Sequence, residues 1–276
     1  MKKHLSTISL IVILIAGLSL LLYPTLADWW NSLHQSYAIA GYESAMANMS
    51  DDDYTYLFEE AMAYNQELRQ VKFPLMYYDE VEGYEELLNI TSNGVMGYVE
   101  IPKIEVKLPI YHGTSEGVLQ IAVGHMEGTS LPTGGESTHC VLSAHRGLPS
   151  ARLFTDLDEM EEGDIFTLYV VDRVMTYEVD QILIVKPAEV EALYVVDGED
   201  YCTLVTCTPY GINTHRMLVR GKRIENKEPE KIVRVTADAA QIEPMLIAPF
   251  VAAPILLVLL IALLTRKPKL YRRPEE

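Results

Sequence analysis

The chain has 276 residues, with 22 basic and 39 acidic side chains, a net charge of −17 and three cysteines. This length accommodates one or two domains with a sizeable core. The acidity argues against nucleic-acid binding, and three cysteines are too few for a disulfide-built miniprotein or a four-cysteine zinc module.

An uncharged apolar run, Leu5–Tyr23, follows the basic start Met1-Lys2-Lys3-His4. A helix of about 20 apolar residues spans the hydrocarbon core of a bilayer. We therefore predict a transmembrane helix or signal anchor within residues 1–27. A cleaved signal peptide is the alternative, with Thr25-Leu26-Ala27 as a weak cleavage site. Either version exports the region that follows.

A second uncharged run, Met245–Leu264, predicts a C-terminal transmembrane helix over residues 244–265. It is preceded by a linker at 229–243 and followed by a basic tail at 266–276. Because Lys and Arg flank the outer side of both runs, the positive-inside rule predicts that both termini are cytoplasmic. The intervening region then lies outside the cell membrane.

For residues 28–92 the sequence predicts an extracellular, largely helical segment before the strand-rich region, which we call the lead. Ser50 and the three aspartates after it are typical of a helix start, and apolar residues follow at helical spacing. Gly41 and Ser50 together indicate two helices within Asp28–Gln70. The rest of the lead, up to Ser92, predicts a surface segment with one short helix at Glu82–Leu88.

Residues 93–228 are rich in short runs of Val, Ile, Tyr and Thr separated by Pro, Gly and Asp. Eight such runs with almost no intervening helix predict a mainly β fold, an antiparallel barrel or a sandwich. The expected strands are Val95–Ile101, Glu105–Tyr111, Gly117–Val123, Cys140–Ala144, Ile165–Val171, Met175–Val185, Tyr201–Thr206 and Met217–Ile224.

Three residues at the ends of these strands carry candidate chemistry: His145, Cys207 and Arg216. A thiolate attacks a carbonyl, an imidazolium protonates the leaving amine, and a guanidinium stabilises the oxyanion. By residue type alone the signal is weak, because a single strand cysteine is more often a small buried hydrophobe.

The motifs around these residues are more specific. The run from Thr203 to Cys207, TLVTC, followed by TPYGINTHR, resembles the TLxTC…R signature of sortases, and within them the pilin-polymerising class C group. Four further stretches match: Gly97–Pro102, Leu108–Thr114, Gly124–Pro132 and Ser143–Pro149. The resemblance implies a closed eight-stranded sortase β-barrel with N-terminal helices and flanking transmembrane helices.

The resemblance also implies roles. Cys207 becomes the nucleophile, His145 the acid/base and Arg216 the substrate- or oxyanion-stabilising cation, with no metal or cofactor. Cys207 would cleave an LPxTG-like signal between Thr and Gly and pass the acyl group to a pilin Lys as an isopeptide bond. Leu204, Thr206 and Thr208 are expected to contact substrate.

Other readings stay open. One is a housekeeping sortase that anchors proteins to cell-wall peptidoglycan, and another is a catalytically silent membrane scaffold that binds pilins.

Many class C sortases carry a lid with an Asp-Pro-aromatic triplet before the barrel. Here Val71–Glu80 has no such triplet. Phe73, Tyr77 or Tyr78 are the candidates to plug the site in a nonstandard lid.

The remaining motifs read as structural. His125, His139, Cys140 and His215 lack metal-ligand spacing. Cys202 and Cys207 should face opposite sides of one strand, whereas a cross-strand pairing of Cys140 with Cys202 stays open. Leu131–Gly135, LPTGG, looks like a substrate signal but is interpreted as a loop.

Overall fold

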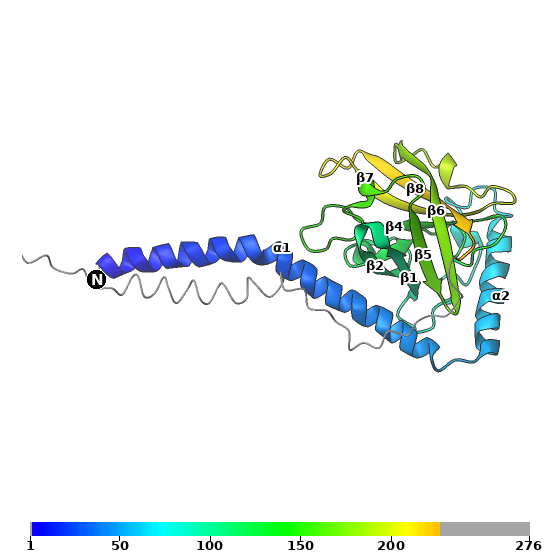
Figure 1. Cartoon of the computed structure of the whole chain (residues 1–276), viewed down its shortest axis with the longest axis horizontal. Coiled ribbons are helices and arrows are strands. Elements are labelled where there is room, and N and C mark those ends of the chain that lie inside the picture. Colours follow the sequence, from blue (N-terminus) through cyan, green and yellow to red (C-terminus); the bar gives the residue numbers. More distant parts are fainter. Residues whose placement is uncertain (1, 227–276) are drawn as a thin grey trace, which may run out of the picture. The chain divides into compact units, whose positions relative to one another are not determined.

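The computed structural model describes residues 2–226, with side chains from residue 9 onward (Figure 1). The predicted C-terminal transmembrane helix, linker and tail lie outside the described residues. The helices and strands are α1 (Lys2–Met46), α2 (Asp51–Leu68), β1 (Val95–Ile101), β2 (Val106–His112), α3 (Glu116–Leu119), β3 (Val123–His125), β4 (Thr138–Ser143), β5 (Ile165–Val170), β6 (Arg173–Val185), β7 (Asp200–Thr208) and β8 (His215–Ile224), with short 3₁₀ turns at Tyr78–Glu80, Pro102–Ile104, Leu157–Glu159 and Glu191–Leu193.

The strands close into an eight-stranded barrel in the order β1-β2-β3-β4-β7-β8-β6-β5, which confirms the predicted fold class. The barrel is not wholly antiparallel, however, because β2–β3 and β4–β7 are parallel pairs. Long connections carry the chain across the barrel before each of these pairings, as parallel neighbours require.

One expected strand is wrong. Gly117–Val123 begins as the short helix α3, because Ser115 caps it by accepting a hydrogen bond from the amide of Val118. Pairing with β2 starts only at Val123. The local cap therefore overrides the strand propensity of the apolar residues that follow.

The barrel interior is filled by apolar side chains from the strands. Gly221 on β8 shows how tight the packing is, because a Cβ there would lie 2.6 Å from the ring of Phe166. Cys202 and Leu204 on β7 belong to this interior and are fully buried. The outer face of β4, β7 and β8 is consequently the face that can carry a site.

Helix α1 runs without a break through Gly41, so that residue does not separate two helices as expected. The described part from Ser9 to Met46 is long and apolar enough to cross a membrane. Its C-terminal half packs on the barrel through Ile39, Tyr42 and Met46. The buried Tyr42 hydroxyl donates to the Met96 carbonyl and accepts from the Val171 amide, which fixes α1 to β1 and to the β5–β6 turn.

The second helix of the lead starts where the sequence predicts. Ser50 and Asp53 form a capping box at the start of α2, each side chain bonding the other residue's amide. The short helix expected at Glu82–Leu88 is absent. Gly83 and Leu88 both have positive φ, so this stretch turns instead of continuing a helix and buries Tyr84 and Leu88 in the core.

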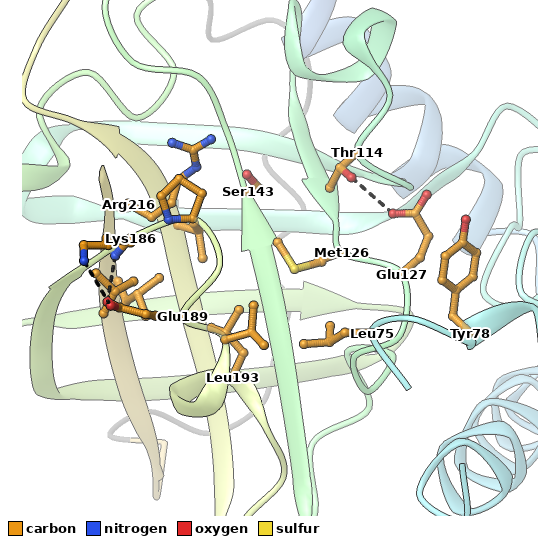
Figure 2. Close-up of a pocket in the computed structure, with 15 residues that line it drawn as sticks. Leu75, Tyr78, Thr114, Met126, Glu127, Ser143, Lys186, Glu189, Leu193 and Arg216 are labelled. Carbon is orange, nitrogen blue, oxygen red and sulfur yellow. Dashed lines mark hydrogen bonds and ion pairs between the residues drawn. The ribbon is translucent and has the colours of Figure 1, made fainter. Parts of the chain in front are cut away.

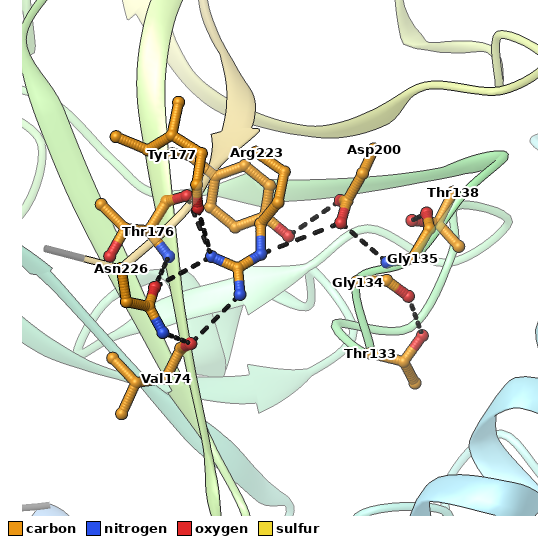
Figure 3. Close-up of polar contacts among 11 residues, drawn as sticks. Thr133, Gly134, Gly135, Thr138, Val174, Thr176, Tyr177, Asp200, Arg223 and Asn226 are labelled. Atoms are coloured by element: carbon orange, nitrogen blue, oxygen red, sulfur yellow. Dashed lines mark hydrogen bonds and ion pairs between the residues drawn. The ribbon is translucent and has the colours of Figure 1, made fainter. Parts of the chain in front are cut away.

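The LPTGG stretch is a loop between β3 and β4 that is buried at Leu131–Thr133 and exposed at Gly135. The Asn65 side chain on α2 accepts from the Leu131 amide and donates to the Leu131 carbonyl and the Thr133 hydroxyl. Figure 3 shows the next residues: the Gly135 amide donates to Asp200 at 2.7 Å, and Asp200 also accepts from Tyr177. These contacts hold the loop against the end of the barrel where β7 begins.

Candidate active site

The three candidate catalytic residues come from three neighbouring segments: Cys207 lies on β7, Arg216 lies on β8, and His145 follows the end of β4 by two residues. Cys207 on β7 is directly paired with Arg216 on β8. The parallel register of β4 and β7 ends with Ser143 opposite Val205. Continuing this register by two residues places His145 level with Cys207. Since neighbouring strands lie about 4.8 Å apart, the residues form a row: His145, Cys207, Arg216.

The backbone just before His145 is held by β7. The Ala144 amide donates to the Val205 carbonyl at 3.1 Å, and the Thr206 hydroxyl donates to the Ala144 carbonyl at 2.9 Å. Ala144, the residue before His145, is thus hydrogen-bonded to Val205 and Thr206, the two residues before Cys207. Strand alternation points Cys207 outward and Cys202 inward, as predicted.

The Arg216 side chain is held at the start of β8. Its Nη1 donates to the carbonyls of Asn213 and His215, at 3.3 and 3.1 Å. These bonds orient the guanidinium within the β7–β8 turn, beside the strand that carries the thiol.

The loops that follow Cys207 and His145 pack on each other. The ring of Tyr210 lies against Gly147 so closely that a Cβ there would be 2.8 Å from it. Arg146 stacks over the same ring, 5.7 Å from its centroid, and forms an ion pair with Asp158. Gly147 also has a positive φ of 74°, so both the close contact and the backbone conformation suit glycine.

A cavity of about 460 Å³ opens on the outer face beside this row. Its floor is the apolar outer face of β4, β7 and β8, including Val205 and Leu218. Figure 2 shows Arg216 and Lys186 on one side and Thr114, Glu127 and Tyr78 on the other. Arg216 is the member of the row that lines the cavity, so the cavity leads to the row from its Arg216 end.

The lead segment forms part of the cavity wall. Tyr78, one of the three lid candidates, lines the cavity, and so does Leu75, which the sequence did not single out. Phe73 and Tyr77 are each 45% exposed and are not among the lining residues. Pro74 and Leu75 pack on Gly128, where a Cβ would lie 2.4 Å from the Pro74 carbonyl oxygen.

The expected substrate contacts from β7 need correction. Leu204 and Thr206 are 0% and 1% exposed and lie on the inward face of β7, opposite to Cys207. Thr208 is also buried. Strand alternation turns the side chains next to the thiol away from the cavity, so these residues support the strand instead of lining the cavity.

A carboxylate that the sequence did not indicate lies beside the imidazole. Glu116 Oε2 on α3 is 3.7 Å from His145 Nε2, which is buried and has no hydrogen-bond partner among the described residues. A hydrogen bond from Gln120, together with the charge of His145, lowers the pKa of Glu116 despite some desolvation. Glu116 is therefore positioned as a negative charge beside the imidazole of His145.

The residues weighed as metal ligands have other partners. His125 bonds Tyr84 and Ser130, His139 bonds Tyr194 and Thr203, and the His215 ring contacts Thr214. Cys140 and Cys202 are register partners inside the barrel, and both are free thiols. Burial raises the pKa of Cys202 well above its usual range, whereas Cys207 is only partly buried.

Comparisons with known proteins show which family the chain resembles. A family model described as the sortase domain matches residues 99–224. The crystal structure of sortase C1 from Streptococcus agalactiae is 49% identical, with a TM-score of 0.65, covering 69% of this chain and 99% of that chain. A crystal structure of Streptococcus pneumoniae sortase C, a protein described with respect to its catalysis and pilin substrate specificity, is 44% identical, with a TM-score of 0.62, covering 70% of this chain and 99% of that chain.

Curated relatives match over a shorter span. Sortase D of Bacillus subtilis is 32% identical over 131 residues, which is 46% of this chain and 63% of that protein. The chain thus covers less than two thirds of the length of this relative.

Proposed function

The chain belongs to the sortase family, and on that premise we propose that it is a class C cysteine transpeptidase that assembles pili. The observation that carries the proposal is the pairing of Cys207 with Arg216 beside a cavity, with His145 two residues beyond the end of the neighbouring strand β4. The likeness to sortase C1 over nearly its whole solved chain favours class C.

In the first step the Cys207 thiolate attacks the Thr carbonyl of an LPxTG-like sorting signal. The Arg216 guanidinium, already oriented by the Asn213 and His215 carbonyls, donates hydrogen bonds to the developing oxyanion. Protonated His145 gives its proton to the departing Gly amine, and a thioester to Cys207 remains. Glu116 Oε2 lies 3.7 Å from the imidazole nitrogen of His145.

In the second step a pilin Lys amine attacks the thioester. Neutral His145 takes the proton from the amine, an isopeptide bond forms, and Cys207 leaves as thiolate. Hydrolysis would end the polymer, so the site must exclude water until the amine arrives. The partners of this reaction are a pilin that carries the sorting signal and a second pilin that supplies the lysine.

We propose that the enzyme is held in the cell membrane with both termini cytoplasmic and the catalytic barrel extracellular. The long apolar part of α1 and the basic residues flanking both apolar runs support this orientation. Residues Lys72–Tyr78 are proposed to act as a nonstandard lid, with Leu75 and Tyr78 at the cavity wall.

The test is to incubate the full chain in detergent with an LPxTG peptide and measure intact mass. We expect an adduct equal to the peptide without its Gly tail, and its loss in Cys207→Ala. Adding a lysine-bearing pilin peptide should convert the adduct into an isopeptide product. Exclusive use of a peptidoglycan amine would indicate the housekeeping activity. Lack of an adduct with any sorting peptide, with pilin binding intact, would indicate the silent scaffold.

A further inference from the structure

The part of α1 next to its apolar run uses one face to contact the barrel. Half-buried or buried side chains recur at helical spacing from Asp28 to Met46. Towards Met46 this stripe is apolar, through Ile39 and Tyr42. Towards the apolar run it is polar, through Asp28, Asn31 and Gln35. The apolar half of the stripe therefore packs on the barrel, whereas the polar half forms hydrogen bonds.

The polar half bonds to the backbone of two loops. Asp28 Oδ1 accepts from the Arg152 amide and Asn31 Nδ2 donates to the Ser150 carbonyl, both at 2.8 Å. Gln35 Nε2 donates to the Ile121 carbonyl at 2.7 Å. Backbone-directed bonds of this kind fix the course of a loop whatever side chains it carries.

These two loops carry the imidazole and the carboxylate beside it. The loop from His145 to Arg152 folds back on itself, since the Phe154 amide donates to the His145 carbonyl at 3.2 Å. Ile121 closes the turn after α3, the helix that begins with Glu116. A single helix face thus holds both sides of the His145–Glu116 pair.

We propose that Asp28, Asn31 and Gln35 are positioning residues that set the distance between His145 and Glu116, so that the membrane-proximal helix is part of the catalytic scaffold. The inference rests on the proposed function. At 3.7 Å the two side chains lie just outside hydrogen-bond distance. A small shift of either loop therefore makes or breaks the pair.

The three residues lie outside the cavity, so their loss should affect the chemical step more than peptide binding. In the variant Asp28→Ala/Asn31→Ala/Gln35→Ala, we expect kcat to fall about tenfold with KM within about twofold, because misplaced catalytic groups lose rate steeply. Asp28→Asn keeps the acceptor oxygen and should retain activity. The matched control is Ser32→Ala/Ser36→Ala/Tyr37→Ala on exposed positions of the same helix, where the two serine hydroxyls bond within the helix.

The experiment uses the full chain in lipid nanodiscs and three measurements. Hydrogen exchange should quicken in peptides covering residues 146–152 and 117–122 of the triple variant but not of the control. Peptide turnover gives kcat and KM. The rate of Cys207 alkylation by iodoacetamide against pH reports the influence of His145 on the thiol without any substrate, and its midpoint should shift in the triple variant alone.

The third measurement separates the two proposals. If the wild type does not turn over the peptide, the proposed function fails, and the alkylation profile still decides the positioning role. Faster loop exchange with an unchanged alkylation midpoint and unchanged kcat would overturn the inference, because the contacts would then be merely structural. Unchanged loop exchange would overturn it as well.

Discussion

The outer face of β4, β7 and β8 has two ends that carry similar residues with different surroundings. The first, which we call the closed end, contains His139, Thr203 and Arg220. The second, the open end, contains His145, Cys207 and Arg216. At the closed end the Arg220 guanidinium binds both oxygens of Asp180, at 2.9 and 2.7 Å.

The histidines of the two ends, His139 and His145, differ in their hydrogen-bond partners. Both ring nitrogens of His139 are bonded, to the Tyr194 carbonyl and the Thr203 hydroxyl, and the side chain is buried. At the open end, His145 Nε2 has no hydrogen-bond partner among the described residues, and the His145 side chain keeps 26% exposure. The histidine of the closed end thus has both ring nitrogens bonded within the fold, whereas the histidine of the open end keeps Nε2 available for chemistry.

The largest expected contrast is between the two arginines. We expect Arg216→Lys to lower kcat by about 100-fold, because a lysine cannot reproduce the planar donor set for an oxyanion. Arg220→Lys should leave kcat near the wild-type value and lower thermal stability, because it loses the paired bonds to Asp180 and the contact with Tyr201. Peptide turnover and thermal unfolding of both variants would measure this. Equal losses of kcat in the two variants would contradict the division into an open and a closed end.

A smaller effect is expected at the proposed lid segment, Lys72–Tyr78, which contributes Leu75 and Tyr78 to the cavity wall. Leu75→Ala removes apolar contact between the proposed lid and the cavity floor. A loss of about 1 kcal/mol from the free energy that keeps the lid closed would raise the population of open molecules about fivefold. Cys207 alkylation should quicken accordingly. Met76→Ala is the matched control, because Met76 is 70% exposed. Alkylation that stays unchanged in Leu75→Ala, and after deletion of Lys72–Tyr78, would refute the lid.

The smallest effect concerns pH at the closed end. Burial lowers the pKa of His139 below its ordinary value of 6.5. Because the folded state then binds the proton less readily than the unfolded state, stability is fully present above pH 6.5 and falls as pH drops towards the folded pKa.

His139→Gln, which keeps a donor and an acceptor, should reduce this slope by at most about 1.4 kcal/mol per pH unit. Denaturant unfolding at pH 7, 6 and 5 would measure it, and an identical slope in the variant would contradict the assignment.

Much of the barrel and the three residues of the row could be predicted from the sequence. The strand runs are rich in β-branched residues and bounded by turns, and the TLVTC motif is long enough to be specific. The structure of the lead, residues 28–92, was harder to predict. Gly83 and Leu88 adopt positive φ, and Tyr84 and Leu88 are buried in the core. Tertiary packing determines this backbone conformation.

Two parts of the candidate site had no local signal. Glu116 lies beside His145 only because α3 and the loop after β4 meet in space. The contacts of Asp28, Asn31 and Gln35 join residues that are 86 to 124 positions apart along the chain. Inward-facing Leu204 and Thr206 show the converse, since they share the motif with Cys207 but not its face.

The unbroken course of α1 has a consequence for which proteins the barrel can meet. From Tyr23 to the buried Tyr42 the helix rises about 28 Å at 1.5 Å per residue. With α1 anchored in the membrane as proposed, the barrel would be held at a fixed distance from the bilayer surface instead of on a flexible linker. A membrane-bound substrate whose cleavage site is presented at another height would be rejected by geometry, however well its sequence fitted the cavity.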